Sequence, residues 1–250
     1  MHRRMPAKGS ESSRMNYRRY RFRFKQTITT ILARDDETYR KAVTGMMYAR
    51  EKIEEYIALN PIFLTSLEPL ECHGDVVERM CAASRIAGVG PMAAVAATVA
   101  WYGVERANSD LIVIDNGGDI VIKNDESITI GIYAGNRTSV GFEIEGNGKL
   151  KSVCTSSGKI GPSISFGFAD AATIFSDNPA LADAFATALG NRIKEDHGKE
   201  EITEVLEEFW EHAKKYVDGA LVIKDNVLAY VGEIPELKTV KIEPDLITRG

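Results

Sequence analysis

Strand patterns follow one another closely in the middle of the chain, and this order limits the folds that are open to it. The stretches LIVID, IVIK and SITIGIY, at 111–115, 120–123 and 127–133, have strand composition. The next stretch, 140–153, predicts a hairpin around Gly146-Asn147-Gly148. Because adjacent strands occur in runs between helices, we predict an α+β fold with a largely antiparallel sheet flanked by helices, in one globular body.

The remaining segments predict helices and further strands. Apolar spacing and helix start and stop signals indicate helices over 35–60, 75–87, 91–101, 179–194 and 200–217. The alternation of apolar and charged residues predicts one long strand from Tyr20 to Leu32. A short strand is expected at 171–175, and Asp225-Asn226 is expected to turn a last hairpin.

Charge is distributed unevenly along the chain. Residues 1–16 are basic and polar, and we expect them to form a flexible tail before a domain at 17–250. Without residues 1–25 the chain holds 22 basic and 35 acidic residues, a net charge of about −13. A domain this acidic is poorly suited to bind the phosphate backbone of nucleic acid. We therefore expect no nucleic-acid partner.

Three properties of the sequence indicate the cellular compartment of the protein. No apolar stretch of the signal-peptide kind occurs near the N-terminus. Residues 86–104 carry no charge, but alanine and glycine dominate them and Pro91 interrupts them, so a buried helix is expected instead of a membrane span. Cys72, Cys81 and Cys154 are an odd and sparse set, more typical of a reducing compartment than of a disulfide framework. We expect a cytoplasmic protein with no membrane partner.

Two short segments combine polar groups suited to ligand binding. Asn116-Gly117-Gly118-Asp119 would let a backbone approach a bulky ligand while Asp119 supplies a carboxylate, or it is a simple hairpin turn. Cys154-Thr155-Ser156-Ser157-Gly158 groups a thiol, hydroxyls and backbone amides, which suits phosphate binding or a nucleophile, with Lys159 as a local cation. An ordinary serine and threonine turn is the alternative.

Asp183 and Thr187 are four residues apart near the start of a predicted helix, so both side-chain oxygens lie on one face. A carboxylate and a hydroxyl form a partial site for Mg²⁺, which completes its shell with water and substrate phosphate. The alternative is structural, since aspartate favours a first helical turn and threonine often bonds back to a carbonyl. The alanine-rich helix at 91–103 fits either the core or a homo-oligomer interface.

Three segments in this order, GVGPMAAVA, DNGGDIVI and CTSSG followed by LADAFATAL, resemble the FAD:protein FMN transferase (ApbE) superfamily. The resemblance covers most of residues 25–195. It implies an ApbE-like fold, magnesium ligands at Asp183 and Thr187, and a pocket for FAD lined by 116–119 and 155–158. An acceptor protein would then receive FMN.

The chain departs from the transferase pattern in two places. Pro91-Met92-Ala93-Ala94 replaces the family's lysine-glycine-tyrosine run, and KIGPSISFGFAD at 159–170 replaces its histidine-containing segment. These segments resemble a divergent branch of the superfamily more than the transferases. In this branch Cys154 stands directly before the threonine and serine segment. We expect a protein that binds an anionic flavin- or phosphate-bearing small ligand, with magnesium. The alternatives are Cys154-dependent sulfur transfer toward homocysteine, with a sulfur-relay partner, and non-catalytic ligand binding.

Overall fold

An eight-stranded sheet forms the centre of the computed structural model, which describes residues 17–133, 139–158 and 167–240. Its strand order is β1-β2-β3-β4-β7-β8-β9-β10, and every neighbouring pair is antiparallel. The strands are β1 (Arg18–Phe24), β2 (Thr27–Ala33), β3 (Ile112–Asn116), β4 (Asp119–Lys123), β7 (Leu150–Ser156), β8 (Ala171–Ser176), β9 (Gly219–Lys224) and β10 (Val227–Gly232). The predicted antiparallel α+β architecture is confirmed.

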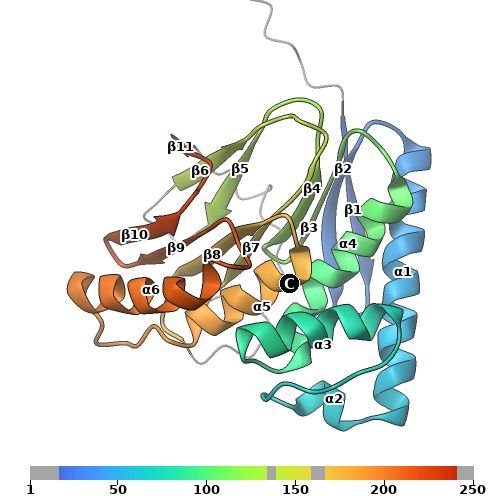
Figure 1. Cartoon of the computed structure of the whole chain (residues 1–250). Coiled ribbons are helices and arrows are strands. Elements are labelled where there is room, and N and C mark those ends of the chain that lie inside the picture. The colour runs from blue at the N-terminus through green and yellow to red at the C-terminus, as the bar shows by residue number, and fades with distance from the viewer. Residues whose placement is uncertain (1–16, 134–138, 159–166, 241–250) are drawn as a thin grey trace, which may run out of the picture.

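Helices cover one face of this sheet (Figure 1). They are α1 (Asp36–Leu59), α2 (Ile62–Thr65), α3 (Asp75–Ala87), a 3-10 helix η1 (Pro91–Ala94), α4 (Val95–Ala107), α5 (Pro179–Gly190) and α6 (Lys199–Ala213). Asp35 caps α1 as the sequence predicts, since its carboxylate accepts a hydrogen bond from the Thr38 amide at 2.8 Å. Buried alanines and Ile114, Val121 and Ile174 of the sheet build the core beneath the helices.

A three-stranded sheet covers the other face, in the order β11 (Glu236–Thr239), β6 (Ser139–Ile144), β5 (Ile128–Tyr133). A second apolar core lies between the two sheets, where the rings of Phe142 and Phe175 meet edge to face at 4.8 Å. The molecule therefore has three layers, with helices, the main sheet and the small sheet in turn (Figure 1).

The predicted hairpin around Gly146 is wrong, because β6 joins the small sheet whereas β7 pairs with β4 and β8. Asn124 redirects the chain here: its side-chain amide donates to the carbonyls of Ile144 and Glu145 at 3.3 and 3.2 Å. The backbone carbonyl of Asn124 accepts a hydrogen bond from the Gly148 amide at 2.8 Å. Gly146-Asn147-Gly148 is a typical turn sequence. The strands on either side of it do not pair, because the apolar residues of β6 are buried against the main sheet.

Element boundaries also differ from the sequence prediction. The segment 20–32 is a hairpin of β1 and β2 that turns at Lys25, whose φ is +52°. Helix α4 continues beyond Trp101 to Ala107, whereas α5 and α6 end earlier than predicted, at Gly190 and Ala213. The hairpin at Asp225-Asn226 is confirmed.

Cys72 and Cys81 form a disulfide, although the odd and sparse set of cysteines is more typical of a reducing compartment than of a disulfide framework. Helix α3 brings Cys81 back beside the loop that holds Cys72, with 5.9 Å between the Cα atoms. Both side chains are buried. Cys154 keeps a free thiol.

Among the described residues, no single helix has the length and apolar composition needed to cross a membrane. Asp75–Ala87 and Pro91–Ala107 meet that requirement only when taken as a pair, and the two are bent by 107°.

Candidate functional site

Strand register places four polar side chains in one row across the main sheet. Thr29 on β2, Asn116 on β3, Asp119 on β4 and Cys154 on β7 are successive cross-strand partners. Side chains two residues apart share a face of a strand. Asp119 is two residues from Val121, which packs in the helix-side core, so the row faces the helices.

Helices α4 and α5 pack against the strands that carry this row (Figure 1). The Ala97 amide donates to the Oδ2 atom of Asp183 on α5 at 3.0 Å. The Asn116 side-chain amide donates to the Ala96 carbonyl at 2.9 Å. The first turn of α4 therefore connects α5 to β3, and it brings Asp183 to the row.

The carboxyl groups of Asp119 and Asp183 interact electrostatically. Burial raises the pKa of Asp119 well above its usual value, and the nearby charges of Asp183 and Asp115 raise it further. Burial raises the pKa of Asp183 to about 7, although hydrogen bonds from the Ala97 and Ala96 amides oppose the shift. Two interacting carboxyl groups favour either retention of a proton or a bound cation.

Cys154 belongs to the same cluster but lacks the properties of a nucleophile. Its side chain is 0% exposed, and its Sγ atom lies 3.9 Å from the Pro179 carbonyl. Burial raises the pKa of the thiol well above its usual value, and the charges of Asp119 and Asp183 raise it further. Sulfur transfer through Cys154 requires a lowered pKa. The described residues around Cys154 raise the pKa of its thiol instead.

The segment Asn116 to Asp119 is a two-residue hairpin turn between β3 and β4. Gly117 and Gly118 have φ values of +74° and +105°, and the Gly118 amide donates to the Asp115 carboxylate at 2.9 Å. A Cβ atom added to Gly117 would meet nothing within 4 Å. The segment is therefore a hairpin turn, and among the described residues no atom fills the space beside Gly117.

The CTSSG segment is divided between the two faces of the sheet. Thr155 points away from the row, and its hydroxyl pairs with that of Thr173 at 3.0 Å. Ser156 lies against Gly190 of α5, and the Gly158 amide donates to the Ala169 carbonyl at 3.1 Å. Ser157 is half-buried after the strand. Thr155 therefore lies on the face of the sheet opposite to Asp119 and Cys154.

Lys159 and residues 160–166 of the KIGPSISFGFAD segment lie outside the described residues. The adjoining residues, from Gly167 to Ala169, run beside the end of α5, where the Phe168 amide donates to the Ile193 carbonyl at 2.9 Å.

The two predicted magnesium ligands occupy successive turns of α5. Asp183 is 7% exposed and Thr187 is half-buried. No hydrogen bond within the described ranges joins the Thr187 hydroxyl to Asp183, whose Oδ2 atom accepts from the Ala97 amide. Over those same ranges, no three His, Cys, Asp or Glu side chains are grouped to hold a metal.

Three contributors to the site were missed by sequence reasoning. Ala96 and Ala97 act through backbone groups, which leave no side-chain signal. Thr29 extends the row. Its buried hydroxyl, like that of Thr98 on α4, has no hydrogen-bond partner among the described residues. The alternation in β2, which places Thr29 on the face of buried Ile31, was the available signal for this residue.

Comparisons with known proteins identify the family and the fold. The model of a family described as AbpE bacteria matches residues 11–222. A UPF0280 protein of Archaeoglobus fulgidus is 48% identical over 237 residues, which is 93% of this chain and all of that protein. A UPF0280 protein of Methanothrix thermoacetophila is 44% identical over 238 residues, 92% of this chain and 98% of that protein.

A solved structure shares the fold. The apo form of the Pseudomonas stutzeri flavinyl transferase ApbE aligns with a TM-score of 0.52 over 86% of this chain and 94% of that one. Sequence identity is 12%, so this likeness concerns the fold alone. The resemblance to the ApbE superfamily is confirmed, and the chain belongs to the family described as AbpE bacteria, a divergent branch with an ApbE-like fold.

Proposed function

We propose that this protein binds an anionic, phosphate-bearing small ligand beside Asp119 and Asp183, and that a magnesium ion links the two carboxylates to the ligand. FAD is the first candidate for the ligand. The observation that carries the proposal is the electrostatic interaction of Asp119 with Asp183, whose carboxylate is held by the Ala97 amide at the start of α4. Burying two like charges together is costly unless a proton or a cation compensates them.

The residues present fit magnesium. Asp119 and Asp183 would hold the ion, and Thr187 offers a hydroxyl one turn further along α5. Mg²⁺ prefers oxygen ligands, usually takes one or two carboxylates from a protein, and keeps positions for water and phosphate. Such an ion would offset the negative charge of a phosphate group. The Ala97 amide would keep the Asp183 carboxylate in place.

The turn at Gly117 and Gly118 supports an approach by a bulky ligand, because Gly117 is exposed and, among the described residues, no atom lies within 4 Å of a Cβ added to it. The solved relative in fold is named a flavinyl transferase, and this makes a flavin the natural probe. We propose ligand binding and not flavin transfer, because Pro91 to Ala94 replace the family's lysine-containing run. These residues form the uncharged helix η1.

The test is isothermal titration of FAD into the wild type and two variants, with Mg²⁺ and with a chelator. Asp183→Asn removes one charge from the pair, and Asp196→Asn is the matched control because Asp196 is exposed in the turn after α5. We expect FAD binding that requires Mg²⁺, is weakened at least tenfold by Asp183→Asn and is unchanged by Asp196→Asn.

Two further readouts separate the alternatives. Inorganic pyrophosphate, titrated in the same way, tests for a phosphate ligand other than a flavin. Release of AMP from FAD separates turnover from binding alone. If neither FAD nor pyrophosphate binds with Mg²⁺, or if both bind equally well to Asp183→Asn, the proposal is wrong.

A further inference from the structure

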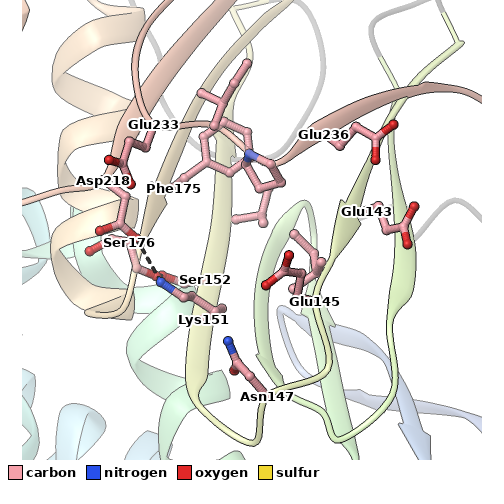
Figure 2. A pocket seen from close by; sticks show the side chains of 14 residues that line it. Glu143, Glu145, Asn147, Lys151, Ser152, Phe175, Ser176, Asp218, Glu233 and Glu236 are labelled. Atoms are coloured by element: carbon pink, nitrogen blue, oxygen red, sulfur yellow. Dashed lines mark hydrogen bonds and ion pairs between the residues drawn. The ribbon is translucent and has the colours of Figure 1, made fainter.

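A cavity of about 460 Å³ lies between the two sheets, away from the helix-side cluster (Figure 2). Its volume is in the range of small-molecule sites. Val153 and Phe175 form part of its wall, and both belong to the core between the sheets. Cys154, the next residue after Val153, points to the helix face. The cavity is therefore separate from the site of Asp119 and Asp183.

The lining combines apolar side chains with an excess of carboxylates. Ile144 and Ile234 extend the apolar wall begun by Val153 and Phe175. The charged lining residues are Glu143, Glu145, Asp218, Glu233, Glu236 and Lys151. Five of these six are acidic, and such a lining attracts a cation.

Three of the five carboxylates are already paired. Lys151 binds Asp218 at 3.1 Å. Lys238, on β11, binds Glu143 at 3.0 Å and Glu236 at 2.8 Å. Within the described part of the chain, no ion pair engages Glu145 or Glu233. These two carboxylates remain available to a ligand.

The backbone positions of both carboxylates are fixed by the fold. The Asn124 side chain donates to the Glu145 carbonyl at 3.2 Å, and Asn124 is itself fully buried. The Glu233 amide donates to the Asp218 carbonyl at 2.8 Å. In Figure 2 Glu145 and Glu233 lie on different sides of the cavity, with Phe175 in the region between them. The arrangement is acidic at two ends and apolar in the middle.

We propose that this cavity binds a linear aliphatic diamine or polyamine. One ammonium group would meet Glu145, the other would meet Glu233, and the methylene chain between them would lie along the apolar wall. A hydrated metal ion is a poorer match, because it gains nothing from apolar side chains and the two carboxylates lie on different sides of the cavity. The proposal is independent of the function proposed for Asp119 and Asp183.

Putrescine titrated into the full-length protein tests this proposal. Glu145→Gln and Glu233→Gln remove the two carboxylates, and both residues are exposed, so the variants should fold. Glu207→Gln is the matched control, since Glu207 is exposed on α6. We expect saturable binding, weakened about fivefold by either cavity variant, about 20-fold by both together, and unchanged by the control.

Ammonium chloride and magnesium chloride at equal ionic strength test the contribution of the methylene chain, and both should bind more weakly than putrescine. Amide resonances of Val153 and Ile234 should shift when putrescine binds. Absence of saturable binding to the wild type, equal weakening in all three single variants, or equal affinity for Mg²⁺ would each overturn the proposal.

Discussion

Removing the charge of Asp183 should change how the stability of the metal-free protein depends on pH. Burial raises the pKa of this carboxyl from 3.8 to about 7, so the folded protein holds a proton that the unfolded chain has released over that range. Stability is then greatest at low pH and falls as the pH rises toward about 7. Above this value the cost of burying the ionised carboxylate is fully present.

The size of the effect follows from the shift. A tenfold change in an acid dissociation constant corresponds to about 1.4 kcal/mol, so the full penalty for ionised Asp183 is about 4 kcal/mol. Between pH 5 and pH 8 the wild type should lose about 2.5 kcal/mol relative to Asp183→Asn. The carboxyl of Asp119 acts in the same direction, because its pKa is also raised.

Urea unfolding in the presence of a chelator, at pH 5 and at pH 8, measures this difference. Saturating Mg²⁺ at pH 8 should restore the stability of the wild type, because the ion binds the ionised pair, and should restore that of Asp183→Asn much less. Parallel changes of the unfolding free energy with pH in the two proteins would refute the reasoning.

Three further predictions concern individual side chains. Iodoacetamide should label Cys154 only after unfolding, since the thiol is 0% exposed and its pKa is raised; rapid labelling of the native protein at pH 8, followed by mass spectrometry, would reinstate a reactive cysteine. Thr155→Val should change the affinity for FAD in the presence of Mg²⁺ by less than about twofold, because the Thr155 hydroxyl lies on the other face of the sheet. A larger loss of affinity in the titration would place Thr155 in the site. Gly45→Ala should lower the free energy of unfolding by about 2–3 kcal/mol in a thermal or urea melt. The added Cβ would meet the Tyr102 carbonyl and, at 2.7 Å, the Cβ of Arg106, where α1 packs on α4. An unchanged melt would contradict that close approach.

Periodicity predicted most elements because each is specified by residues close together in sequence. The spacing of apolar residues gave α1, and the turn at Asp225 gave the last hairpin. The hairpin predicted around Gly146 failed because strand pairing there depends on which core buries the apolar face of β6, and a local pattern carries no such information.

The site was only partly predictable for a similar reason. Asn116, Asp119 and Asp183 stood out because of their chemistry, and the structure brings them together. Strand alternation could have separated Thr155 from Cys154, since consecutive residues of a strand face opposite ways. The amide of Ala97 could not have been found, because its role depends on where α4 meets α5.

The most direct test of the central claim uses Mn²⁺ in place of Mg²⁺ and follows the phosphorus resonances of bound FAD. If Asp119 and Asp183 hold a cation that contacts the ligand's phosphates, Mn²⁺ should broaden those resonances strongly in the wild type. The broadening should disappear when both residues are changed to asparagine, and it should persist in Asp196→Asn. Unbroadened resonances in the wild type with bound FAD, or equal broadening in the double variant, would contradict a cation site at this carboxyl pair.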